Sequence, residues 1–442
     1  MTREEVDRSK ITPMMKQYLE IKDENLDNIL FFRLGDFYEM FFDDAVTASR
    51  ELELTLTGKS CGLEERVPMC GIPYHAANIY IEKLVDKGYK VAICEQTEDP
   101  KNAKGIVKRD IVQIISSGTR MNSEFLDEGS NNFIGAILDL KYSYVISYAD
   151  ISTGEIYTTI LEHNISKVIS EIVGLNIKEI VMNSKVDKNI LSILKNQFKI
   201  TVTISDEVEN DKQYEYIYED IGDVRYIETI KHLLTYITNT QKRSLTHLQK
   251  AIIKENKNYL KMDVHTKRNL ELTETLRLKQ RNYSLIWLLD KTKTAMGARL
   301  LRTWLTEPLV EVDAINKRLD CVESFKNNVL DRAELREQLS SINDIERLMS
   351  KVIYATANAR DLLSLKNSFK CLPDIKNAIK SFPCALIDDI VGQFDVLEDL
   401  YQLLNASINE EPPFSVREGG LIKKGYNEEV DKLHAAKEEG AS

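Results

Sequence analysis

The sequence of 442 residues lacks any hydrophobic run that approaches the roughly 20 apolar residues required by a membrane-spanning helix. Its first residues, from Met1 to Asp7, show no apolar stretch behind a positive end, so we expect no secretory signal. No Cys-x-x-Cys pair occurs, which argues against a zinc site, and we expect reduced thiols in a cytoplasmic protein. The six irregularly spaced cysteines are Cys61, Cys70, Cys94, Cys321, Cys371 and Cys384.

A complete phosphate-binding loop is also missing. Residues 58–60 (Gly-Lys-Ser) have the form of its last part, but Glu53 stands where the first glycine of the Gly-x-x-x-x-Gly-Lys-Ser/Thr motif would be. No other segment of the sequence completes the motif. We therefore expect no ATP hydrolysis by this chain, no resident cofactor or metal, and no catalytic residues.

The sequence has no excess of positive charge either. It holds 59 Lys and Arg against 70 Asp and Glu, a formal net charge of −11, which argues against a generic nucleic-acid binder. Charge acts locally, however, and phosphate contacts need only one positive surface. One cluster without intervening acids is available, consisting of Lys101, Lys104, Lys108 and Arg109.

The length predicts about two to four domains. Strand and helix patterns alternate in the first half, and the second half is almost wholly helical, so the predicted fold class is multidomain, mixed α/β followed by all-α. The predicted divisions are a mixed α/β domain at 1–118, a linker at 119–130, a second α/β domain at 131–250, a long-helix domain at 251–408, and the start of a further helix at 409–442.

Hydrophobic periodicity and turn residues predict the elements of each domain. In the first domain, Thr12 should cap a helix that begins at Pro13. The other predictions are strands in 29–42, 91–94 and 110–115 with helices at 43–54 and 78–88; then strands at 133–138, 144–149, 155–161 and 179–182 with a helix at 168–173; and finally helices at 266–279, 296–305, 312–331, 333–352, 359–371 and 386–406.

The most informative segment is 32–42, where an apolar run breaks at Gly35-Asp36 and resumes as aromatic residues around one carboxylate. If residues 37–40 are extended, Phe37 and Glu39 point to one face and Tyr38 and Met40 to the other. One face can join a core, and the other presents an aromatic ring beside an acid. The alternative is that Phe37 is itself a core residue, as most phenylalanines are.

Several segments, in this order along the chain, resemble the bacterial MutS family of DNA mismatch-recognition proteins. They are residues 12–18 (Thr-Pro-Met-Met-Lys-Gln-Tyr), 35–39 (Gly-Asp-Phe-Tyr-Glu), 71–76 (Gly-Ile-Pro-Tyr-His-Ala), 91–96 (Val-Ala-Ile-Cys-Glu-Gln), 117–119 (Ser-Gly-Thr), 149–155 (Ala-Asp-Ile-Ser-Thr-Gly-Glu), 268–272 (Arg-Asn-Leu-Glu-Leu) and 297–305 (Gly-Ala-Arg-Leu-Leu-Arg-Thr-Trp-Leu). The resemblance implies a mismatch-recognition domain, a ribonuclease-H-like connector domain and a helical core or lever domain. Residues 425–429 resemble the start of a lever helix toward the clamp, and most of the clamp and the ATPase are absent.

The resemblance further implies that the chain binds double-stranded DNA at mismatched or looped-out bases. Phe37 would wedge into the duplex from the minor groove, and Glu39 would contact the mispaired base. Full-length members use ATP and Mg, form homodimers and work with a MutL-type partner in the bacterial cytoplasm, on the nucleoid when bound to DNA. Candidate phosphate contacts are Arg33, Lys59, Lys108 and Arg109.

Two alternatives remain open on the sequence. The first is a metal-dependent nuclease that uses Asp139, Asp150 and Glu171 of the connector domain, because paired carboxylates can hold catalytic metal ions. The second is a helical scaffold that binds repair proteins without reading DNA.

Overall fold

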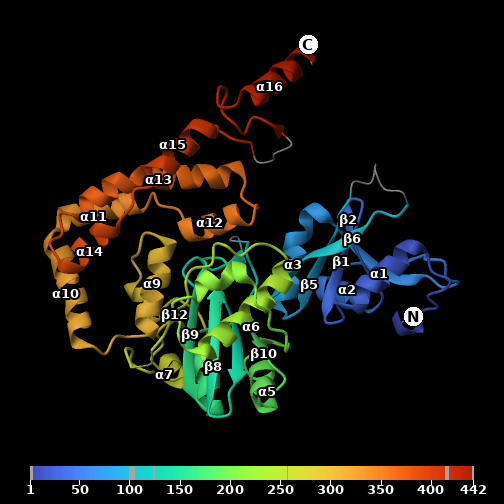
Figure 1. Ribbon diagram of the computed structural model, residues 1–442, viewed down its shortest axis with the longest axis horizontal. Helices are drawn as coiled ribbons and strands as arrows, with labels where there is room; N and C mark the ends of the chain where they lie inside the picture. Colours follow the sequence, from blue (N-terminus) through green and yellow to red (C-terminus); the bar gives the residue numbers. More distant parts are fainter. Residues whose placement is uncertain (1–2, 99–104, 123–124, 256, 414–417, 441–442) are drawn as a thin grey trace.

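The computed structural model describes residues 3–98, 105–122, 125–255, 257–413 and 418–440. Three regions follow one another along the chain: a mixed α/β domain, a second α/β domain and a helical region (Figure 1). The predicted fold class, two mixed α/β domains followed by a helical region, is confirmed. Among the described residues, no helix is both long and apolar enough to cross a membrane.

The first domain is built on a six-stranded sheet with the order β3-β4-β2-β1-β5-β6. Helices α2 and α3 cover one face, and α1 covers the other, so hydrophobic cores lie on both sides of the sheet. Thr12 occupies the N-cap position of α1 as predicted, but its hydroxyl makes no capping hydrogen bond. The elements are α1 Pro13–Asp23, β1 Asn28–Leu34, β2 Phe37–Phe41, α2 Phe42–Leu52, β3 Thr57–Lys59, β4 Val67–Pro73, α3 Ala77–Asp86, β5 Lys90–Gln96 and β6 Arg109–Ile115.

The second domain also has a six-stranded sheet, with the order β11-β10-β7-β8-β9-β12. The long helix α6 packs on one face, and α4 and α5 pack on the other. The bounds are β7 Phe133–Asp139, β8 Ser143–Asp150, β9 Glu155–Glu162, α4 Ile165–Gly174, β10 Glu179–Met182, α5 Lys188–Asn196, β11 Thr201–Ile204, α6 Val224–Gln241 and β12 Ile252–Ile253.

The helical region begins beside the second sheet, and α16 lies at the far C-terminal end (Figure 1). Its helices are α7 Val264–Asn269, α8 Leu285–Leu289, α9 Ala295–Thr306, α10 Val312–Asn327, α11 Val329–Leu339, α12 Ile345–Ile353, α13 Ala359–Ile379, α14 Ala385–Gln393, α15 Glu398–Ser407 and α16 Glu428–Gly440. Some of these helices are shorter than predicted or split in two, whereas α13 extends beyond the predicted 359–371.

The predicted helix at 333–352 is split between α11 and α12. Two other helix predictions were wrong in a way that local conformation explains. The predicted helix at 266–279 stops at Asn269, because Glu271 and Lys279 adopt positive φ angles and the chain folds back until Ile286 donates a backbone hydrogen bond to Leu272. The predicted helix at 386–406 is broken before α15, where Leu397 also has a positive φ.

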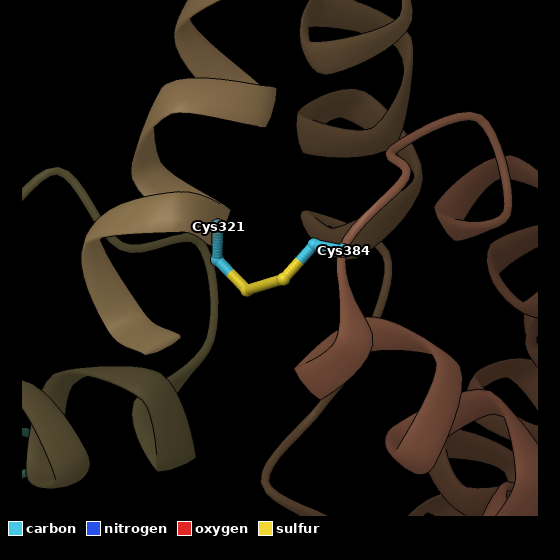
Figure 2. Close-up of a disulfide and its surroundings, with 2 residues drawn as sticks. All are labelled: Cys321 and Cys384. Atoms are coloured by element: carbon cyan, nitrogen blue, oxygen red, sulfur yellow. A yellow bond between two sulfur atoms is a disulfide. The ribbon is translucent and has the colours of Figure 1, made fainter. Parts of the chain in front are cut away.

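The prediction that all cysteines are reduced was also wrong. Cys321 on α10 and Cys384, which directly precedes α14, form a disulfide in the structure (Figure 2). The pair is separated by 63 residues in sequence, and its Cα atoms lie 5.7 Å apart. Packing of α10 against α14 brings the two thiols together, which the irregular cysteine spacing could not indicate. The other cysteines are free: Cys61, Cys70, Cys94 and Cys371.

Two buried arginines join the helical region to the second domain. Arg299 on α9 donates to both carboxylate oxygens of Asp344, at 2.7 and 2.8 Å, and to the carbonyl of Glu128. Arg347 on α12 donates to the carbonyl of Ser130 at 2.8 Å and to the Ser152 hydroxyl. Segment 127–130 is therefore held between the two regions rather than being a free connector.

Candidate nucleic-acid interface

A tight hairpin carries the residues that the sequence singled out. Strands β1 and β2 pair antiparallel up to Leu34 and Phe37, which leaves Gly35 and Asp36 as the two turn residues. Gly35 has a φ of +59°, a conformation that glycine adopts without the strain of a Cβ atom. The turn thus places Phe37 at the very beginning of β2.

Side chains of β2 alternate between the two faces of the sheet as predicted. Tyr38 and Met40 enter the core beneath α2 and α3. On the opposite face, Phe41 is buried under α1, Glu39 is partly covered, and Phe37 is 47% exposed. The alternative that Phe37 is a core residue is therefore wrong: its ring lies at the open end of this face.

Glu39 is paired with a cation from another strand of the same sheet. Its carboxylate forms an ion pair with the Lys59 ammonium from β3, and Lys59 also lies 5.6 Å from the centre of the Phe41 ring. The intervening strand β4 places Gly71 opposite Glu39, where an added Cβ would lie 3.5 Å from Glu39 Cγ. Glu39 and Lys59 were predicted to be separate DNA contacts, whereas the structure brings them together.

Arg33 braces the turn end of the hairpin. Its guanidinium lies 3.7 Å from the centre of the Tyr74 ring, and its Nε donates to the carbonyl of Gly35 at 2.5 Å. Its ion pair is with Glu95, at 3.4 Å. The Tyr38 hydroxyl also donates to Glu95, and burial together with this carboxylate raises the pKa of Tyr38.

The other two phosphate candidates differ sharply in exposure. Arg109 is only 8% exposed, and its guanidinium donates to the carbonyl of Arg33 at 2.7 Å and to Gln17 Oε1 at 3.1 Å. Burial also lowers the pKa of Arg109. These contacts hold β6 and α1 against the hairpin, so Arg109 supports the site from within. Lys108 is exposed, and Lys101 and Lys104 lie outside the described residues.

Two of these supporting residues had no role predicted from the sequence. Tyr74 stacks on Arg33, and Glu95 binds both Arg33 and Tyr38. Both stand in segments that carried the family resemblance, residues 71–76 and 91–96, which was the only signal available for them.

The carboxylates proposed for a nuclease do not converge. Asp139 ends β7 beside the start of β8, whereas Asp150 ends β8 beside the start of β7. The two positions therefore lie at opposite ends of a ladder of seven residue pairs, roughly 20 Å of strand apart. Asp150 is fully buried and accepts hydrogen bonds from the backbone N–H groups of Asn132 and Ser152. Within the described ranges, no group of three or more metal-ligating side chains occurs.

Comparison with known proteins places the whole architecture in one class. Residues 12–124 match MutS domain I, residues 132–249 match MutS domain II, and residues 265–439 match MutS domain III. The two α/β domains and the helical region thus correspond, in order, to three consecutive domains of one protein class.

Curated relatives agree with the domain matches. The chain is 48% identical over 438 residues to the DNA mismatch repair protein MutS of Clostridium novyi, covering 97% of this chain and 48% of that protein. It is 47% identical over 442 residues to the same protein of Clostridium tetani, covering 98% of this chain and 50% of that protein. The chain belongs to the MutS family, and it spans about half the length of these relatives.

Proposed function

We propose that this chain binds double-stranded DNA at mismatched or looped-out bases, as the recognition part of mismatch repair. The observation that carries the proposal is the exposed Phe37 ring, presented at the end of a strand that is paired on both edges. Membership of the MutS family, whose curated relatives are named DNA mismatch repair proteins, supports the same function.

The selectivity would come from the cost of opening the duplex. Inserting a ring between stacked, paired bases costs on the order of a few kcal/mol per step. A mispaired or unpaired base is already poorly stacked, so the same insertion costs less there. Phe37 would enter from the minor groove, stack on the loosened base and kink the duplex. Because every base has a π-face, one ring can serve many different mismatches.

Glu39 and Lys59 would act as a unit beside that ring. In the free protein, the Lys59 ammonium neutralises the Glu39 carboxylate. On DNA, Lys59 would turn toward a phosphate and release Glu39 to contact the mispaired base. The carboxylate would then accept a base N–H, or donate to a ring nitrogen if it is protonated. Lys108, which is exposed, would supply a further phosphate contact, and Arg33 would contact the backbone only from beneath the turn.

The remaining functional expectations are proposals as well. We propose that the chain by itself catalyses no reaction, because its sequence contains no complete phosphate-binding loop. ATP and Mg, a homodimeric assembly, a MutL-type partner and a location in the bacterial cytoplasm belong to this proposal through the family.

Equilibrium binding to matched DNA pairs tests the proposed function. Affinity for a duplex with one mismatch is compared with affinity for the fully paired duplex at several salt concentrations. Preference for the mismatch should persist as salt rises, because stacking is screened far less than phosphate attraction. Equal affinity for both duplexes at every salt concentration would contradict the proposal and favour the scaffold alternative. Magnesium-dependent cleavage that Asp150→Asn abolishes would favour the nuclease alternative.

A further inference from the structure

A buried carboxylate lies where the first domain meets the second. Glu179 is the first residue of β10 and is fully buried. Its Oε1 accepts a hydrogen bond from the Tyr236 hydroxyl at 2.6 Å. Its Oε2 accepts from the backbone N–H of Gly118 at 3.1 Å and from the Ser116 hydroxyl. The Lys90 ammonium lies 3.5 Å from Oε1 and provides the opposite charge.

Most of these partners come from outside the second domain. Only Tyr236, on α6, belongs to it, whereas Lys90 begins β5 of the first domain and Ser116 and Gly118 follow β6. A buried carboxylate is costly unless it is paired and hydrogen-bonded. Separating the domains would leave Glu179 with one hydroxyl and no cation. The two domains therefore share a single charged centre that is satisfied in one relative orientation.

Contacts around this centre restrict rotation as well as separation. Gln113 of β6 donates to Gln241 of α6 at 2.8 Å. The Ser117 hydroxyl donates to Thr201 of β11 at 2.9 Å. Because these contacts flank Glu179, the first domain cannot pivot about the carboxylate without breaking at least one of them.

The interface is also closely packed. A Cβ atom added at Gly118 would lie 2.8 Å from Glu179 Cβ and 2.9 Å from Ile134 Cβ. Such distances are shorter than real Cβ contacts, so no larger residue fits at Gly118 without displacing the neighbouring strands β10 and β7. The close approach between the end of the first domain and the second sheet thus depends on this glycine.

A short path of paired strands leads from this centre to the candidate DNA contact. Lys90 on β5 is the register partner of Asn28 on β1, and β1 pairs with β2, which begins at Phe37. These strands are interior to the sheet and hydrogen-bonded on both sides, so a shift at Lys90 moves the start of β2 with it. We propose that Glu179 is a positioning residue: through Lys90 it sets the direction in which the Phe37 ring faces relative to the rest of the chain. The effect of this orientation on mismatch binding rests on the proposed function. The claim that Glu179 fixes the orientation of the two domains does not.

The geometric part is tested by a distance measurement without DNA. Spin labels are attached through Lys16→Cys on α1 and Lys195→Cys on α5, both exposed positions, in a Cys371→Ser background in which the remaining free cysteines are buried. Glu179→Gln keeps the shape of the side chain but removes the charge opposite Lys90, and it replaces one accepting oxygen with an NH2 group that would face hydrogen-bond donors. We expect the distance distribution between the labels to broaden. Glu162→Gln, at an exposed ion pair of the same domain, is the matched control and should leave it unchanged.

Lys90→Met is a second variant in case Glu179→Gln fails to fold, because it removes the cation but leaves the hydrogen bonds from Ser116, Gly118 and Tyr236 to Glu179. Circular dichroism and thermal melting show whether each variant is folded. An unchanged distance distribution in a folded variant would overturn the shared-centre interpretation.

The functional part is tested with the same variants and the duplexes described above. We expect Glu179→Gln to lower affinity for mismatched DNA about 3- to 30-fold, the usual range for coupling through a packed network. Affinity for paired DNA should stay unchanged, because phosphate attraction tolerates a variable orientation. Suppose that Phe37→Ala lowers mismatch affinity. A Glu179→Gln variant with a broadened distance distribution but unchanged mismatch affinity would then overturn the positioning role. If Phe37→Ala also has no effect, the proposed function fails, and the distance result alone decides whether the domains share this centre.

Discussion

The Glu39 carboxylate and the Lys59 ammonium form an ion pair across the intervening strand β4, two residues along β2 from the exposed Phe37 ring. An aromatic surface and a paired charge therefore lie on one face of one sheet. Their proximity gives the first two predictions.

Phe37→Ala should remove the preference for mismatched DNA. Stacking of one aromatic ring on a base contributes about 1–3 kcal/mol, so mismatch affinity should fall about 5- to 150-fold. Because the ring is half exposed, the thermal melting temperature should remain nearly unchanged. Tyr142→Ala is the matched control, an exposed ring in the second domain, and should bind like the unaltered chain. A drop in melting temperature as large as that of a core substitution would show that Phe37 has a structural role instead.

Glu39→Ala should raise affinity for paired DNA. Removing a carboxylate near a phosphate and freeing Lys59 would change the interaction by about 1 kcal/mol, or roughly fivefold, at low salt. The gain should shrink as salt rises, because salt screens exposed charges. Glu20→Ala removes an exposed carboxylate from α1 and serves as the control. Paired-DNA affinity that does not change would contradict the proposed repulsion.

His232 should make the second domain sensitive to mild acid. Burial lowers the pKa of this imidazole from its ordinary 6.5, and its Nε2 lies 2.9 Å from the carbonyl of Ser205. The unfolded chain binds a proton near pH 6.5 that the folded domain does not, so stability falls as pH drops below that value. His232→Gln should reduce the fall in melting temperature between pH 7 and roughly pH 5.

Two other histidines set the expected size of this effect and its control. Burial lowers the pKa of His247 as well, so His232→Gln should remove only part of the acid sensitivity. His163→Gln is the control, because this ring is exposed and stacks on Tyr144. A pH profile identical to that of the unaltered chain would show that His232 does not carry the effect.

Reducing the Cys321–Cys384 disulfide should destabilise the helical region. Closing a loop of 63 residues restricts the unfolded chain by roughly 4 kcal/mol in the chain-entropy model. Thermal melting with and without a thiol reductant measures the effect, and the double variant Cys321→Ser with Cys384→Ser should match the reduced chain. Cys371→Ser, which removes a free cysteine, is the control: reductant should lower its melting temperature as it does in the unaltered chain. The same melting curve under both conditions would contradict a stabilising cross-link.

The sequence was most informative where neighbouring residues decide the outcome. Alternation along β2 correctly put Phe37 and Tyr38 on opposite faces, because the two-residue period of a strand is local, but it left open whether Phe37 is itself a core residue. The partner of Glu39 could not be found in this way, because Lys59 reaches it across an intervening strand. Arg109 illustrates the same limit: a cation within a basic segment folds inward because carbonyl oxygens and Gln17 are available to it.

Long-range packing explains the larger errors as well. Hydrophobic periodicity over 266–279 suggested one continuous helix, yet Leu276 is exposed, and the chain instead folds back so that the Leu285 backbone N–H donates to the Glu271 carbonyl. Likewise, the disulfide depends on the packing of α10 against α14, which no local pattern contains. Residues whose neighbours lie far away in sequence were therefore the ones least accessible to prediction.

Strand β2 is hydrogen-bonded along both of its edges, to β1 and to β4. Its backbone consequently holds position 37 in place whatever side chain is attached there. The side chain at position 37 can thus be changed without changing the direction in which it points. A photoreactive amino acid installed at this position would report which atoms it meets, with little disturbance of the fold.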